Sequence, residues 1–78
     1  MTVEVVFEAG AEGAVHSHPH LQTIYVRSGT FDFVVDGVYQ RVTTGDSLVI
    51  PSGVRHGCKA VEAGSLIDSF SPRRDDFL

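Results

Sequence analysis

The sequence predicts an all-β domain, and three observations lead to this prediction. Short runs rich in β-branched and aromatic residues recur along the chain, several with alternating apolar and polar positions. Turn signals separate these runs at intervals of about 8 to 12 residues, as in sandwiches and barrels. No segment shows the i, i+3, i+4 spacing of apolar residues that indicates a sizeable helix. We therefore expect strands on both sides of one shared interior.

The expected strands follow one another with turns between them. They cover residues 3–7, 23–27, 31–35, 38–42, 47–50, 56–61 and 65–70. The turns are expected at Gly10 and Gly13, Ser28-Gly29, Asp36-Gly37, Thr44-Gly45-Asp46, Pro51-Ser52-Gly53 and Glu62-Ala63-Gly64. Asp36-Gly37 fits a two-residue hairpin, since glycine accepts the positive φ of that turn. We expect one domain over residues 1–78, with a barrel core at residues 3–70 and a tail at residues 71–78.

The length of the chain limits how stable it is on its own. A hydrophobic content of 42% in 78 residues is enough for a core. A domain this short buries only about 60% of its unfolded surface, so it needs a metal or a partner subunit. The strand edges also need cover. We therefore expect a homodimer, with residues 3–7 at or near the interface.

Charge and composition exclude several classes of function. The net charge is −4, from 6 basic and 10 acidic residues, and Asp75-Asp76 follows the only basic pair, Arg73-Arg74. We expect no binding to nucleic acid or anionic membranes, which calls for a basic surface. No apolar stretch approaches the length of a membrane span, and the first residues lack the pattern of a signal peptide. The lone cysteine, Cys58, suits a reducing compartment, so we expect a cytoplasmic protein.

Histidines suggest a metal site. His16 and His18 are two residues apart, and on a strand both side chains would point to the same face. Gln22 offers a neutral amide oxygen, and His56 follows the Pro51-Ser52-Gly53 turn. We expect these four side chains to bind one divalent ion, which could be Zn, Ni, Fe, Mn or Cu. Such a set leaves coordination positions open, as substrate-binding sites do. His20, which follows Pro19, is expected at the rim of the site.

Two segments have the spacing of a known pair of motifs. The first reads Gly10, five residues, His16-Ser17-His18, three residues, Gln22, six residues and Gly29. The second reads Gly45, five residues, Pro51-Ser52-Gly53, two residues and His56. In both segments the chain resembles the cupin superfamily, which implies a small, single-domain, jelly-roll-like β-barrel. It departs from the usual pattern at Gln22, where glutamate is common, and at Ala60, where asparagine is common.

Within the cupins, the chain resembles the KdgF group of pectin-degradation proteins. The similarity lies in residues 16–20, in glutamine as a ligand and in residues 66–78. An Asp-x-Phe-x3-Arg set of that group falls on Asp68, Phe70 and Arg74. The resemblance implies that the protein opens the ring of 4,5-unsaturated uronates to linear keto acids. Members of the group are longer at the N-terminus, so this chain is expected to lack strands that help to close the barrel or that swap between subunits.

The resemblance also implies roles for these three residues, and alternatives stay open. Asp68 would act as general acid and base, Arg74 would pair with the substrate carboxylate, and Phe70 would stack on the sugar ring. The same residues also fit a solvated ion pair and a core aromatic residue. Two other functions fit the predicted metal ligands: an oxygen-activating dioxygenase, and a non-catalytic cupin that binds a metal or small ligand.

Overall fold

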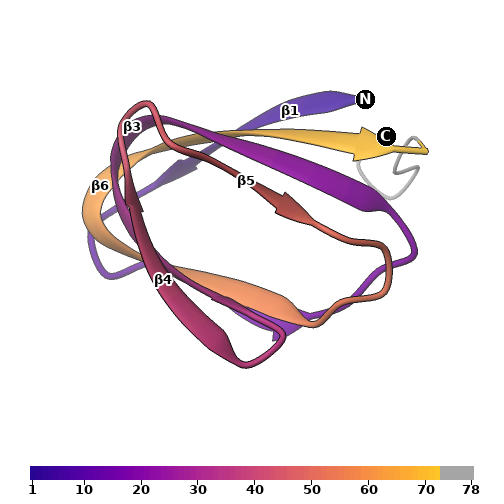
Figure 1. Cartoon of the computed structure of the whole chain (residues 1–78). Coiled ribbons are helices and arrows are strands. Elements are labelled where there is room, and N and C mark those ends of the chain that lie inside the picture. Colours follow the sequence, from indigo (N-terminus) through magenta and orange to yellow (C-terminus); the bar gives the residue numbers. More distant parts are fainter. Residues whose placement is uncertain (73–78) are drawn as a thin grey trace.

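All regular secondary structure in residues 1–72, the part of the chain that the structure describes, is β-strand. The computed structural model has the strand order β1 (Thr2–Phe7), β2 (Glu12–His16), β3 (Leu21–Val35), β4 (Val38–Thr43), β5 (Ser47–Ile50) and β6 (His56–Ser71) (Figure 1). The all-β prediction is therefore confirmed. The search of these residues for a helix that could cross a membrane finds none.

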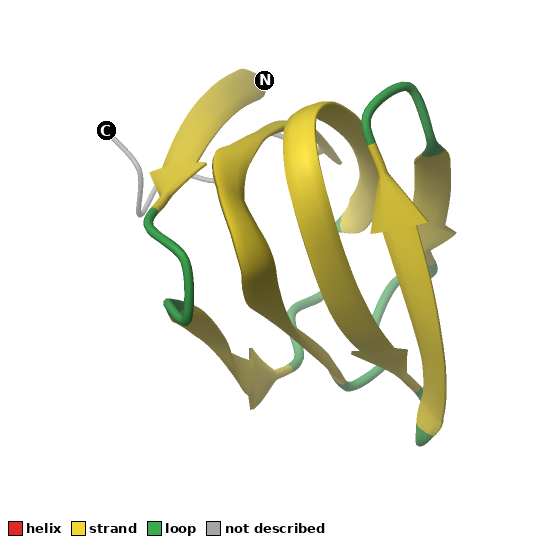
Figure 2. Cartoon of the chain, turned by 90° about the vertical axis from the view of Figure 1, so that its left-hand side faces the viewer, coloured by secondary structure: helices red, strands yellow, loops and turns green. Residues whose placement is uncertain are grey.

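The two longest strands, β3 and β6, form the centre of the sheet. They run antiparallel from the pair Leu21 and Ser71 to the pair Val35 and His56. β1 and β2 pair with different halves of β6, while β5 and β4 pair with different halves of β3. The sheet thus has two halves, β1-β6-β3-β5 and β2-β6-β3-β4, that share the same two strands. In Figure 1 the halves face each other across an oval interior, and Figure 2 shows how the long strands curve.

β3 and β6 bend together where the sequence predicts turns. Strand ends are expected at Ser28-Gly29 and at residues 62–64, and both expectations are wrong because the strands continue through these positions. The register shifts at several points between Val26 and Phe31, so bulges take up the curvature and the ladder resumes on either side. Gly29 has a φ of 91°, which glycine adopts without strain. The turn signals at Ser28-Gly29 and at residues 62–64 therefore mark bends within strands. The chain does not reverse there, because β3 and β6 remain paired with each other on both sides of the bend.

Gly64 lies where the two strands approach closely at this bend. A methyl group on Gly64 would overlap the backbone carbonyl of Ser28, and one on Gly29 would lie 2.7 Å from the carbonyl oxygen of Ala63. We expect Gly64→Ala to lower the free energy of unfolding by about 1–3 kcal/mol or more, since backbone atoms cannot rotate away from the new methyl group. Urea unfolding measures the change, with Ala63→Ser as an exposed neighbouring control. Equal midpoints for wild type and Gly64→Ala would contradict this close packing.

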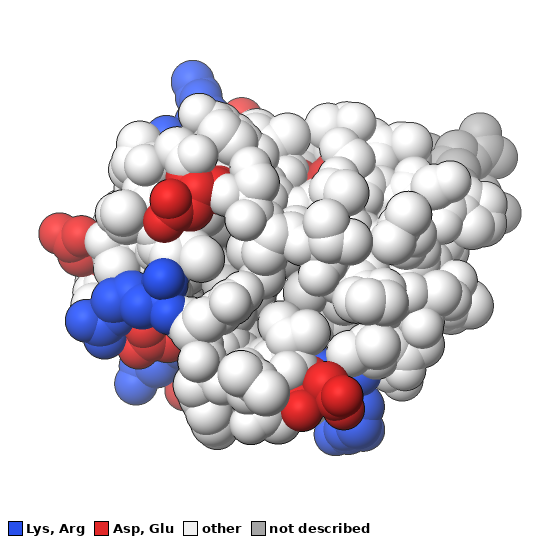
Figure 3. Space-filling view, in the orientation of Figure 1, with Lys and Arg blue, Asp and Glu red and all other residues white. Residues whose placement is uncertain are grey.

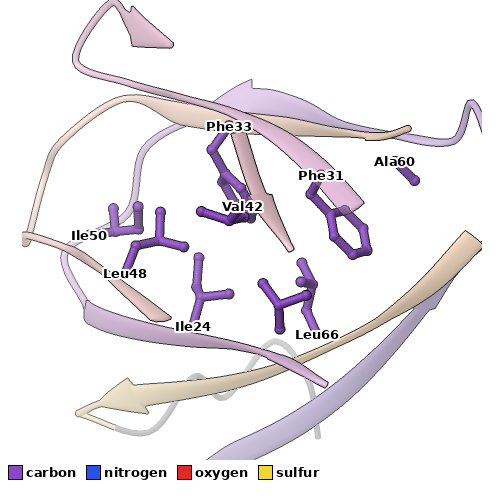
Figure 4. Packing of buried hydrophobic residues seen from close by; sticks show 9 residues of the cluster. Ile24, Phe31, Phe33, Val42, Leu48, Ile50, Ala60 and Leu66 are labelled. Carbon is purple, nitrogen blue, oxygen red and sulfur yellow. The ribbon is translucent and has the colours of Figure 1, made fainter. Parts of the chain in front are cut away.

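The hydrophobic core fills the space between the two halves of the sheet. In β3 the buried side chains are at even positions up to Val26 and at odd positions from Phe31, which is the phase change that a bulge produces. Phe31 and Phe33 enter the core from one half, and Ile24 and Leu66 enter from the other (Figure 4). The two halves are therefore held together by interlocking apolar side chains.

Two pairs of oppositely charged side chains lie on the outside of the sheet. Arg41 on β4 donates hydrogen bonds of 2.8 and 3.0 Å to Asp32 on β3, and these hold the pKa of the Asp32 carboxyl below its usual range. Arg27 pairs with Glu4 across strands at 2.6 Å. Both pairs are exposed, so they contribute little to stability. On the face shown in Figure 3, charged residues gather mainly toward the bends of β3 and β6, and most of the loop end is uncharged.

Candidate metal centre

The predicted metal ligands lie at the loop end of the oval, away from the bends (Figure 1). His16, the last residue of β2, is paired in register with His56, the first residue of β6. Gln22 is near the start of β3, where its partner on β6 is Phe70. His18 lies in the connection between β2 and β3. Strand pairing therefore brings together residues that are far apart in the sequence.

The expectation that His16 and His18 share one strand is wrong, because β2 ends at His16. Pro19 follows three positions after the last ladder residue of β2 and has no N–H with which to extend the ladder. His18 instead reaches the site from the connecting loop. The two rings still approach each other, with 5.5 Å between their centroids.

The three histidines form one compact cluster. One potential ligand atom from each of His16, His18 and His56 lies within 4.8 Å of the other two. The His56 ring centroid is 4.6 Å from that of His16 and 4.9 Å from that of His18. Ligand atoms bound to one ion at about 2.1 Å are about 3 to 4 Å apart, so metal binding needs only a modest inward movement of the rings. His56 is buried and His16 is exposed, so the cluster opens to solvent on the His16 side.

Backbone carbonyl groups orient two of the rings. Nδ1 of His16 lies 2.6 Å from the carbonyl oxygen of Ala14, and Nδ1 of His56 lies 2.9 Å from that of Val54. In a neutral imidazole, Nδ1 must carry the proton to donate these bonds, which leaves the lone pair on Nε2. Metal-binding histidines commonly have this arrangement, because the second nitrogen fixes the tautomer and the ring direction. The cluster therefore suits a metal ion.

Gln22 and His18 complete the set of donors. The Gln22 side chain is buried, and its Oε1 lies 3.0 Å from Nε2 of His18. Without an ion, His18 donates a hydrogen bond to the amide oxygen. Two neighbouring ligands, each about 2.1 Å from one ion at a right angle, are also about 3.0 Å apart, so the same spacing suits shared coordination. Nδ1 of His18 is buried and has no hydrogen-bond partner within residues 1–72.

His20 lies beside the cluster, where its ring contacts two other rings. It meets His18 edge-on at a centroid distance of 5.3 Å and Phe70 at 6.2 Å. Phe70 also meets the ring of His18 edge-on at 5.6 Å. His20 and Phe70 thus pack around His18 and restrict where its ring can move.

A cavity of about 320 Å³ extends from His16 and His56 into the interior. Its polar lining comes from His16, Gln22, His56 and Asp68. The rest of its wall is mainly apolar and includes Val5, Phe7, Ile24, Phe33, Leu66 and Phe70. Asp68 lines this cavity and is only 8% exposed, so it lies within the fold. A small ligand can therefore lie between the histidine cluster and an acidic side chain.

The structure brings Asp68 and Phe70 to the predicted site, while Arg74 lies outside the described residues. Phe7 and Phe33 also line the cavity, although no motif in the sequence marks them as site residues. Their inward positions in alternating strands were visible in the sequence. Whether an inward side chain meets the core or a cavity depends on the packing around it.

Cys58 also lines the cavity, two residues after His56. Burial raises the pKa of its thiol, a hydrogen bond with the backbone of Gly13 lowers it, and the charge of Asp68 raises it further. The net direction is upward, which favours the neutral thiol. Cys58 is therefore interpreted as an inert, partly buried side chain.

Several known proteins are similar to this chain in sequence and in fold. The chain is 44% identical to the pectin degradation protein KdgF of Dickeya dadantii (strain 3937) over 80 residues, which covers all of this chain and 73% of that protein. The structure of KdgF from Halomonas sp. is also 44% identical, with a TM-score of 0.93 and coverage of 100% of this chain and 73% of that one. An RmlC-like cupin from Shewanella frigidimarina NCIMB 400 is 49% identical, with a TM-score of 0.98 and coverage of 100% and 70%.

The family model of the cupin domain matches residues 3–68. This match includes both segments with the predicted motif spacing and all three clustered histidines. The predicted fold and the resemblance to KdgF are both confirmed. The chain belongs to the cupin family, and it carries a three-histidine cluster that can hold a metal ion.

Proposed function

We propose that the protein is a metal-dependent enzyme that opens the ring of 4,5-unsaturated uronates to linear keto acids. The observation that carries this proposal is that two residues of the histidine cluster, His16 and His56, line one cavity together with the buried Asp68. The similarity to a protein named for pectin degradation supports a uronate substrate. The reaction is an isomerisation, so it requires no co-reactant.

In this proposal, His16, His18, Gln22 and His56 hold one divalent ion. Three imidazoles and an amide oxygen suit first-row metals such as Zn, Ni, Fe, Mn or Cu. When bound, the ion supplies Lewis acidity toward oxygen atoms of the substrate. The buried position of His56 and Gln22 keeps their donor atoms aimed at the cavity.

Asp68 transfers the proton in the proposed reaction. It accepts the proton of the anomeric hydroxyl group as the ring carbon–oxygen bond breaks, which produces an aldehyde and an enolate. Asp68 then returns this proton to the enolate carbon, which gives the ketone, so the atoms and charges balance. The position of Asp68 inside the cavity supports this role, because a general acid and base must reach both substrate atoms.

Phe70 and Arg74 are proposed to hold the substrate. Phe70 lines the cavity and provides an apolar surface for a face of the sugar ring. Arg74 is proposed to pair with the uronate carboxylate, which its planar guanidinium fits well.

The double bond of the substrate provides a direct test. It is conjugated with the carboxylate and absorbs ultraviolet light, and ring opening removes it. We expect protein with confirmed bound metal to accelerate the loss of absorbance of unsaturated galacturonate relative to chelator-treated protein and buffer. If the metal-loaded protein is no faster than buffer, the proposed activity is wrong.

We also propose that the protein is a homodimer in the cytoplasm. β1 pairs with β6 along one side, and Val6 on β1 is 77% exposed, which supports an interface at or near this strand. The single cysteine suits a reducing compartment. Sedimentation at micromolar concentration should give the mass of two chains, and a compact monomer would contradict the dimer.

A further inference from the structure

The turn between β5 and β6 holds the loop that carries His18. The Ser52 hydroxyl donates a hydrogen bond of 2.7 Å to the carbonyl oxygen of Pro19. The backbone N–H of Gly53 donates one of 2.8 Å to the carbonyl oxygen of His18. Two consecutive residues of one turn thus bind two consecutive carbonyl groups of the other loop.

The same turn also orients His56. The N–H of Val54 donates to the carbonyl oxygen of Pro51 at 3.2 Å, which closes the turn. The carbonyl oxygen of Val54 in turn accepts the hydrogen bond from Nδ1 of His56. Residues 51–54 therefore connect a ligand carried by a loop with a ligand carried by β6.

This connection matters because His18 lies outside the strands. The ladder of β2 ends at His16 and β3 begins at Leu21, so strand pairing does not fix the loop between them. Gly53 contributes through its backbone and has a φ of 78°, so a side chain there would strain the turn. Ser52 contributes through its side chain, which a substitution can remove without changing the backbone.

We propose that Ser52 is a positioning residue for the metal site, which holds the His18 loop at the distance from His56 that one ion requires. The inference rests on the proposed metal ligands. Without the hydroxyl group, the loop samples more positions, and part of the binding free energy is used to order it. Removing a supporting hydrogen bond near metal ligands lowers affinity by about tenfold or more.

Co²⁺ titration with chelator competition tests this inference in wild type, Ser52→Ala and Ser52→Thr. Ser47→Ala, at an exposed serine that begins β5, is the matched control. We expect Ser52→Ala to bind Co²⁺ about tenfold more weakly. Its visible Co²⁺ absorption should also change, because that absorption reports ligand geometry. Ser52→Thr, which retains the hydroxyl group, should recover both properties, and Ser47→Ala should match wild type.

The outcomes separate the two proposals. If wild type binds no Co²⁺, the metal site itself is wrong. If wild type binds but Ser52→Ala has the same affinity and spectrum as Ser47→Ala, the positioning role is wrong. A third outcome is that Ser52→Ala lowers the melting temperature of the metal-free protein but leaves the Co²⁺ spectrum of the folded protein unchanged. Ser52 then acts in folding alone, and this result also overturns the inference.

Discussion

Replacing His56 with alanine is expected to lower metal affinity by about 100-fold or more, which exceeds the usual effect of altering residues that only support ligands. His56 is 4% exposed, its ring centroid lies 4.6 Å from that of His16 and 4.9 Å from that of His18, and its Nδ1 is held by a backbone carbonyl group. Metal analysis of the purified variant beside wild type measures the loss. Circular dichroism without metal shows whether the variant is folded.

The same substitution should remove the effect of metal on thermal stability. An ion at 100 times its Kd stabilises the folded state by about 2.7 kcal/mol. For a domain of this size, that corresponds to a rise in Tm of about 10 °C or more. Wild type should show this rise and His56→Ala should not.

His20→Ala provides the matched control, because His20 contacts the ring of His18 but is not among the proposed ligands. It should retain bound metal and the metal-dependent rise in Tm. Equal metal content in wild type and His56→Ala, or complete loss in His20→Ala, would contradict the assigned ligand set.

Asp68→Asn is expected to reduce turnover of unsaturated galacturonate by about 10²- to 10⁴-fold, the usual contribution of a general acid and base. Asparagine has nearly the same shape as aspartate but cannot accept the proton in the same way. Metal content should remain at the wild-type level, because Asp68 is not a proposed ligand. The rate of absorbance loss and metal analysis on the same sample measure both properties.

Asp32→Asn is the control for loss of a carboxylate, since Asp32 lies on the outside and pairs with Arg41. It should retain full turnover. Full activity in Asp68→Asn would exclude Asp68 as the acid and base. Parallel loss of activity and metal would instead indicate that Asp68 acts through the metal site.

The fold class and the family followed from local features of the sequence. Alternating strands, turn residues and the two motif spacings were sufficient because each depends on residues close together in the chain. The types of the proposed donors, three imidazoles and an amide, are also properties of single residues. At Ser28-Gly29 and residues 62–64 the sequence predicts turns, but the structure has bends within continuous strands. The two cannot be told apart locally, since the sequence pattern of a bulge resembles that of a chain reversal.

Local patterns in the chain are enough to predict the all-β class, the cupin motifs and the side chains available for chemistry. The tertiary structure decided that His18 approaches from a loop, that Ser52 holds this loop, and that β1 lines the cavity with Val5 and Phe7. The pairing of His16 with His56 joins residues 40 positions apart. Such contacts depend on the register and curvature of long strands, which the packing of the whole sheet determines and no local pattern specifies.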